Sequence, residues 1–132
     1  MVGVSEELMF RGIVVLHGAL KDTSVIKSVI ISAIVFSLLH SINVLGGNSL
    51  QEMIMQLGFT FVMGMFLGLI ILKVNSLIPL IIFHWLWDFS LISSNIINSQ
   101  NAIINILTGF HFYFEIIAML VLLVLVYRKS RA

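Results

Sequence analysis

The sequence predicts an all-α fold, a polytopic transmembrane bundle of about five helices, and three observations lead to it. Hydrophobic residues make up 60% of the 132-residue chain and charged residues only 10%, whereas soluble domains are about 45–50% apolar and about 25% charged. The mean hydropathy is +1.14. The apolar residues fall into successive runs of roughly 20, the length that crosses about 30 Å of hydrocarbon. We therefore expect an integral, multi-pass membrane protein.

Composition also limits the partners. A net charge of +1 leaves no basic stripe to neutralise phosphates, so no nucleic-acid partner is expected. The absence of cysteine excludes disulfides and thiolate metal sites, and a metal would need imidazole, carboxylate or amide ligands. The first residues carry acids rather than a basic region, which argues against a cleaved signal peptide. The lipid bilayer is the first partner that the sequence predicts.

The first three helices are expected at residues 4–20, 25–46 and 50–73. The first is short and polar at its start, so we expect it to pack against the others. Lys21-Asp22-Thr23-Ser24 separates it from the second helix, which ends in the turn residues Gly46-Gly47-Asn48-Ser49. The third helix contains Gly64-x-x-x-Gly68, a spacing that lets two helix backbones approach closely in lipid.

The last two helices follow a very short turn at Val74-Asn75-Ser76. The fourth has Pro79 in its first turn, where the missing backbone donor removes no hydrogen bond. A polar patch from Ser93 to Asn105 is expected to close this helix as a loop. The fifth helix is predicted over residues 106–127, and it ends in Arg128-Lys129-Ser130-Arg131.

The basic residues predict an orientation. Six of the seven fall at helix ends on one predicted side: Lys21, Lys27, Lys73, Arg128, Lys129 and Arg131. The opposite loops, 43–50 and 94–104, contain no lysine or arginine. Because basic loops stay inside, the C-terminus is predicted to be cytoplasmic and the N-terminus external, provided that the first helix spans the membrane.

Charge is concentrated in the stretch Ser5-Glu6-Glu7-Leu8-Met9-Phe10-Arg11. On a helix Glu7 and Arg11 face each other four residues apart, with the acid N-terminal to the base, which is the favourable order. Glu6 points about 100° away from Glu7, so it needs a partner from another segment. The stretch is either a functional site at membrane depth or an interfacial helix start capped by Ser5, and taken alone it leaves both interpretations open.

Two further pairs lie one helical turn apart, Phe36 with His40 and His84 with Asp88. From the centres of their runs, His40 lies about 6 Å toward one surface and His84 about 4 Å toward the other, and helix tilt could bring them together. Two histidines and a carboxylate from three helices match the ligand set of a catalytic zinc, which keeps one position open for water. A carboxylate not used by the metal could serve as general base.

The remaining histidines and aromatics are interpreted as structural. His17 has no acidic or histidine companion one turn away, and His111 has only Glu115, with which it forms an exposed-looking pair. The aromatic residues Phe10, Phe36, Trp85 and Trp87 are interpreted as packing residues or interfacial anchors.

Three motifs taken together resemble a known family. They are Glu6-Glu7-x-x-x-Arg11, Phe36-x-x-x-His40, and His84-x-x-x-Asp88 preceded by Ser76-Leu77-Ile78-Pro79. In this order, with a glycine-bearing helix before the third motif, the sequence is similar to the CPBP intramembrane metalloproteases. This group comprises the CAAX proteases and the bacteriocin-processing or immunity enzymes also called Abi proteins. The motifs span residues 6–88, about two thirds of the chain.

The resemblance implies one membrane metalloendopeptidase domain over residues 1–132, in a bacterial cell membrane, cutting a peptide or protein substrate at or within the bilayer. Glu6 would activate water. His40 and His84, with Glu6 as a further candidate ligand, would bind a divalent metal, zinc first among them, or stabilise the transition state. Glu7 and Arg11 would hold the geometry of the first motif. Asp88 stands where relatives often carry asparagine; both side chains offer an oxygen, but aspartate adds a charge and cannot donate as an amide does.

Three functions remain open at this stage. Relatives usually have transmembrane helices before the double-glutamate motif, where this chain has five residues, so we expect a minimal member, a fragment or a chain with a misplaced start. An intact acid–histidine set favours a membrane endopeptidase. Missing upstream helices favour a non-catalytic self-immunity protein that binds a bacteriocin or its receptor. In a small transporter or channel subunit, the same buried acids and histidines would relay protons.

Overall fold

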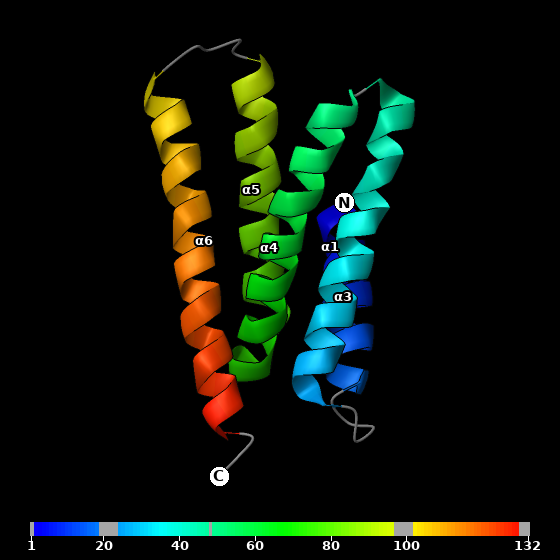
Figure 1. Ribbon diagram of the computed structural model, residues 1–132, viewed down its shortest axis with the longest axis vertical. Coiled ribbons are helices and arrows are strands. Elements are labelled where there is room, and N and C mark those ends of the chain that lie inside the picture. The colour runs from blue at the N-terminus through cyan, green and yellow to red at the C-terminus, as the bar shows by residue number, and fades with distance from the viewer. Residues whose placement is uncertain (1, 19–23, 48, 97–101, 130–132) are drawn as a thin grey trace.

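The computed structural model describes residues 2–18, 24–47, 49–96 and 102–129. In these ranges the chain forms α1 (Val2–Glu7), η1 (Leu8–His17), α3 (Val25–Leu39), η2 (His40–Gly46), α4 (Leu50–Val74), α5 (Ile78–Ile96) and α6 (Ala102–Lys129). The π-helix η1 continues α1 and the 3₁₀-helix η2 continues α3, so the described chain forms five helical rods without a strand (Figure 1). The predicted all-α bundle of about five helices is confirmed.

Three stretches are long and apolar enough to cross a membrane: Val25–Gly46, Leu50–Val74 and Gly109–Arg128. The apolar part of α5 within the described residues, Ile78–Phe89, is shorter. The rod formed by α1 and η1 is not among the three. The predicted external position of the N-terminus depended on this rod crossing the membrane. The composition and these helices identify a membrane protein.

Two helices have almost the predicted bounds, but the segment from Ser93 to Asn105 differs from its predicted structure. The rods Val25–Gly46 and Leu50–Val74 match the expected residues 25–46 and 50–73 to within one residue. The prediction of a loop from Ser93 to Asn105 was wrong at both of its ends, because α5 continues to Ile96 and α6 begins at Ala102; residues 97–101 lie outside the described residues. Serine and asparagine lower helix propensity by less than about 0.7 kcal/mol each, which is small beside the several kcal/mol lost by an unsatisfied backbone group in lipid.

Side chains and turns define both ends of α4. At its start Ser49 Oγ accepts a hydrogen bond from the Glu52 backbone N–H at 3.3 Å, and Glu52 Oε2 accepts one from the Ser49 backbone N–H at 2.7 Å. This capping box satisfies two donors that the first turn leaves free. At its end Asn75 adopts a left-handed conformation with φ of 51° and donates its N–H to the Ile71 carbonyl at 2.8 Å. The chain can therefore reverse directly into α5.

The predicted close approach at Gly64 and Gly68 is present between α4 and α3. A Cβ atom placed on Gly64 would lie 3.0 Å from Ala33 Cα, and one placed on Gly68 would lie 2.9 Å from Val29 Cγ1. Both distances are shorter than ordinary carbon contacts of about 3.5–4.0 Å. The missing side chains thus allow the two helix backbones to pack closely, as in other membrane proteins.

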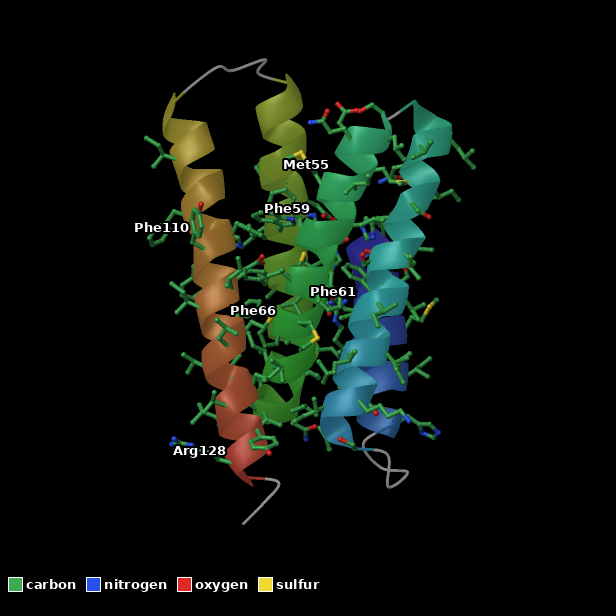
Figure 2. All side chains as sticks on the ribbon, in the orientation of Figure 1. Met55, Phe59, Phe61, Phe66, Phe110 and Arg128 are labelled. Atoms are coloured by element: carbon green, nitrogen blue, oxygen red, sulfur yellow. The ribbon has the colours of Figure 1, made fainter. Side chains whose placement is uncertain are left out.

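Aromatic rings join the opposite face of α4 to α6. Phe59 lies 4.4 Å from Phe112 and Phe66 lies 6.3 Å from Phe114 between ring centroids. Figure 2 shows Phe59 and Phe66 on the α6 side of α4, whereas Phe110 points away from the bundle. The exposed Phe110 belongs on the surface that lipid would cover. Helix α4 is therefore the centre of the bundle, with α3 on one face and α6 on the other (Figure 1).

The first rod packs against the first half of α3 and against α5. Ser32 Oγ in α3 donates a hydrogen bond to the Phe10 carbonyl in η1 at 3.0 Å. Helix α1 begins at mid-height of the bundle, and η1 continues toward the end where α3 begins (Figure 1). The acidic residues of α1 are thereby placed at mid-height, where α1 also contacts α5.

Exposed basic residues gather at one end of the bundle. Lys27 lies near the start of α3, Lys73 near the end of α4 and Arg128 near the end of α6. These three helix ends lie together at the end of the bundle that Figure 2 marks with Arg128. Lys21 and Arg131 lie outside the described residues. The prediction that the basic helix ends lie on one side is confirmed for these three residues. The side of the membrane that they face stays a prediction.

Candidate active site

A buried ion pair forms the inner part of the site. Glu7, the last residue of α1, and Arg11 in η1 are both fully buried, and Arg11 Nη1 lies 2.8 Å from Glu7 Oε1. Arg11 Nη2 also donates to the Gly64 carbonyl at 3.4 Å, and the guanidinium carbon lies 4.5 Å from the centroid of the Phe36 ring. The Glu7–Arg11 pair expected from the sequence is present. A buried charge needs such compensation, which here comes from three neighbours.

The imidazole of His84 lies between two adjacent carboxylates. Its Nδ1 is 2.7 Å from Glu7 Oε1, and its Nε2 is 3.4 Å from Glu6 Oε2. The ring itself is only 2% exposed. The partner that Glu6 required from another segment is therefore a histidine of α5, and one imidazole joins both residues of the double-glutamate motif.

The contact with Glu7 indicates which ring nitrogen of His84 donates. An ionised carboxylate only accepts, so His84 Nδ1 carries a proton and donates it to Glu7. In a neutral ring Nε2 would then direct a lone pair toward Glu6 Oε2 and toward Asp88 Oδ1, which lies 3.7 Å away. The site therefore places an acid, Glu6, and an imidazole, His84, next to each other.

Exposure separates the roles of the carboxylates. The Glu7 side chain is 0% exposed, the Glu6 side chain 12% and the Asp88 side chain 40%. Glu7 is also committed to Arg11 and to His84 Nδ1. Glu6 is therefore the more exposed acid of the motif, and Glu7 is the acid that orients the imidazole.

His40 lies where α3 changes into η2, and its ring, like that of His84, contacts the ring of Phe36. Its Nδ1 is 2.9 Å from the Phe36 carbonyl; because a carbonyl only accepts, Nδ1 donates and Nε2 keeps its lone pair. The Phe36 ring lies 4.9 Å from the His40 ring and 5.7 Å from the His84 ring between centroids. The structure thus places the two histidines around one aromatic ring, although among the described residues His40 forms no ion pair.

Two contacts around the histidines were not expected from the sequence. Phe36 was interpreted as a packing residue, but its ring contacts Arg11, His40 and His84. Its place one turn before His40 was the available signal. Gly3 lies against His84, because a Cβ atom placed there would be 3.5 Å from the ring carbon Cγ. No local pattern around Gly3 indicates this contact.

The donors suit a divalent metal in kind, since imidazole and carboxylate are zinc ligands. Both histidines have a donor hydrogen bond at Nδ1, the arrangement that leaves Nε2 for a metal or a proton. In the described part of the chain, however, no three His, Asp or Glu side chains are grouped so that they could hold a metal ion. The three-ligand set of Glu6, His40 and His84 therefore does not converge in this arrangement.

An all-α membrane bundle with an acid–histidine pair beside a buried arginine defines a polytopic membrane protein with a buried polar cluster. Residues 1–90 match the family model described as type II CAAX prenyl endopeptidase Rce1-like. The chain belongs to this Rce1-like family, which is of the CAAX-type intramembrane protease kind. The match includes every residue of the three motifs and confirms the resemblance. Searches of curated proteins and of solved structures gave no significant match.

Proposed function

We propose that this protein is an intramembrane endopeptidase in which Glu6 activates water for peptide-bond hydrolysis. The observation that carries the proposal is the position of Glu6, partly exposed and facing Nε2 of a histidine that Glu7 orients. By the family description, the substrate class is a peptide or protein with a CAAX-type, prenylated C-terminus. The substrate would meet the site at the bilayer.

The proposed reaction uses Glu6 as the base and His84 as a hydrogen-bond donor. Ionised Glu6 accepts a proton from water as the water oxygen bonds to the scissile carbonyl carbon, which gives a tetrahedral oxyanion. A proton on His84 Nε2 makes a hydrogen bond to this oxyanion and stays on the ring. Glu6 then gives its proton to the leaving nitrogen as the carbon–nitrogen bond breaks, which releases a carboxylic acid and an amine. The acid passes its proton to the amine, so the products are a carboxylate and an ammonium ion, and Glu6 is again ionised.

The other residues of the three motifs support this exchange. Glu7 holds the His84 ring by Nδ1, and Arg11 holds Glu7 in place. Asp88 Oδ1, 3.7 Å from His84 Nε2, lies on the same side of the ring as Glu6. We assign to His40 the orientation of the attacking water, because its Nε2 keeps a lone pair that can accept from water.

A divalent metal is a second proposal for the same site. His40, His84 and Glu6 would be its ligands if they were brought together, and the metal would supply Lewis-acid chemistry at the site. The support is the donor chemistry of these side chains and their Nδ1 hydrogen bonds. Dialysis of the purified protein against a chelator tests it. Loss of cleavage that zinc restores supports a metal, and cleavage that persists without detectable bound metal rejects it.

The test of the protease proposal is Glu6→Gln. The amide keeps the size of the carboxylate but cannot accept a proton from water at neutral pH, so cleavage of a prenylated CAAX peptide should fall by about 10² to 10⁴. Glu7→Gln is the structural control and should lower stability and activity together. Insertion into the membrane has to be measured beside cleavage for both variants.

The same variant separates the protease from the alternative that the protein is a non-catalytic bacteriocin self-immunity protein on this scaffold. A scaffold that only binds a bacteriocin or its receptor should tolerate Glu6→Gln. If Glu6→Gln inserts at the wild-type level and still confers the full cellular phenotype, the binding function replaces the protease.

A further inference from the structure

A second acid–imidazole pair lies in α6, beyond the residues that match the family. His111 Nε2 is 3.4 Å from Glu115 Oε1. Glu115 is only 1% exposed, so its interpretation as part of an exposed pair was wrong. Both atoms are buried and have no hydrogen-bond partner among the described residues. A buried acid in a membrane helix is unfavourable and needs a reason for its presence.

The neighbours of His111 connect this pair to the helix of the site. The His111 ring stacks on Trp87 at 4.5 Å and on Phe83 at 5.2 Å, with an interplanar angle of 25° in each case. In the described part of the chain, both ring contacts between α5 and α6 are made by His111. Phe83 immediately precedes His84, and Trp87 immediately precedes Asp88.

Helix α5 therefore carries two neighbouring stripes. Phe83 and Trp87 face His111, whereas His84 and Asp88 face Glu6. Residues one position apart are separated by about 100° around a helix, so the two stripes turn together when α5 rotates. For side chains about 5 Å from the helix axis, a rotation of roughly 10° shifts their ends by about 1 Å.

We propose that His111 and Glu115 are positioning residues that hold α5 in the rotation at which His84 lies between Glu6 and Glu7. The His111 ring fixes the rotation by stacking on Phe83 and Trp87. Glu115, whose Oε1 lies 3.4 Å from Nε2, restricts the orientation of that ring. The consequence for catalysis rests on the proposed function, because a misplacement of about 1 Å at a reacting group lowers the rate on the order of 10²-fold. The role of His111 and Glu115 in placing His84 does not depend on the proposed function.

Two matched substitutions test the stacking. His111→Phe and His111→Leu both remove the ion pair with Glu115 and both keep an apolar side chain in the bundle, but only phenylalanine can stack on Phe83 and Trp87. The readout is the imidazole Nδ1–H resonance of His84 in protein labelled with ¹⁵N-histidine in lipid nanodiscs. The chain has only four histidines, so loss of the signal in His84→Gln assigns it.

We expect the His84 Nδ1–H signal to stay sharp and protected from exchange in His111→Phe and to broaden or disappear in His111→Leu. Equal signals in the two variants, both inserted at the wild-type level, would overturn the stacking role. For the acid, Glu115→Gln keeps an oxygen that can accept from His111, and it should preserve the signal better than Glu115→Leu. Identical signals in Glu115→Gln and Glu115→Leu would remove Glu115 from the proposal.

Kinetics provide the second readout. His111→Leu should lower kcat by about 100-fold with little change in KM, since it displaces a reacting group and leaves substrate binding intact. His111→Phe should stay close to wild type. A fall in kcat of the same size for both variants would contradict positioning by the stacked ring. If the wild-type protein cleaves no peptide, the proposed protease function fails, and the resonance of His84 still decides the positioning role.

Discussion

The Nδ1 atom of His84 lies 2.7 Å from Oε1 of Glu7, across 77 positions of sequence. The same Glu7 oxygen lies 2.8 Å from Arg11 Nη1. One buried oxygen therefore joins the third motif to the first and fixes α5 against the start of the chain. This makes Glu7 a structural acid and leaves Glu6, on the exposed side of the ring, for chemistry.

Glu7→Gln should destabilise the protein strongly. The substitution leaves the Arg11 guanidinium buried without its counterion, and breaking a buried ion pair from one side costs about 3–5 kcal/mol. Thermal unfolding of the purified protein in detergent measures the loss. The double variant Glu7→Gln with Arg11→Met removes both charges and should recover much of the stability. A double variant less stable than Glu7→Gln alone would show that Arg11 is not held by this pair.

Glu6, His40 and His84 should behave as one unit in the cleavage assay. Glu6→Gln, His40→Ala and His84→Ala should each abolish cleavage, and double variants should be no worse than the single ones, because residues that act together lose their contribution together. His17→Ala, at an exposed position of η1, is the control and should be nearly silent. Full activity of any one of the three single variants would remove that residue from the mechanism.

Gly64→Ala should separate α3 from α4. The added Cβ would meet the Ala33 backbone at 3.0 Å, and forced overpacking of this kind costs about 1–3 kcal/mol. The Gly64 carbonyl also accepts from Arg11, so cleavage should fall with stability. Gly58→Ala on the same helix is the matched control, since nothing lies within 4 Å of its added Cβ. Equal thermal stability of the two variants would contradict the close approach.

The orientation in the membrane can be measured with reporters. A reporter fused after Ala132 should be cytoplasmic, and one inserted at Gly47 should be external, because the basic helix ends at Lys27, Lys73 and Arg128 favour the inside. Both reporters on the same side of the membrane would show that the number of spans between them has been miscounted.

The helices could be predicted from the sequence, because hydrophobic run length and turn residues act locally. The rods Val25–Gly46 and Leu50–Val74 were expected at almost these bounds, and the glycine spacing indicated the contact between α3 and α4. The polar patch after α5 was misjudged, because near a membrane the requirement for internal backbone hydrogen bonds outweighs the weak helix propensity of serine and asparagine.

The pairing of Glu7 with Arg11 could be predicted, but the contacts between the motifs could not. The motifs indicated Glu6, His40 and His84 as candidates, and the Glu7–Arg11 pair followed from helical spacing. That both glutamates face one imidazole depends on the packing of α5 against α1, which no local pattern records. Glu115 was misjudged for the same reason, since its burial depends on how α6 packs rather than on its own neighbours in sequence.

The π-helix from Leu8 to His17 lets the number of residues in the first rod change while the two ends of the rod keep their places. Its backbone donors reach five residues back instead of four, so each turn contains more residues than an α-helical turn. Loss of one residue within this segment can be absorbed by reversion of a turn to α-helical winding, whereas the same loss within α4 would rotate every residue beyond it by about 100°. The sequence spacing between the acids of α1 and the part of η1 that packs against Ser32 of α3 can therefore change. The contacts of the acids and the contact with Ser32 are both kept.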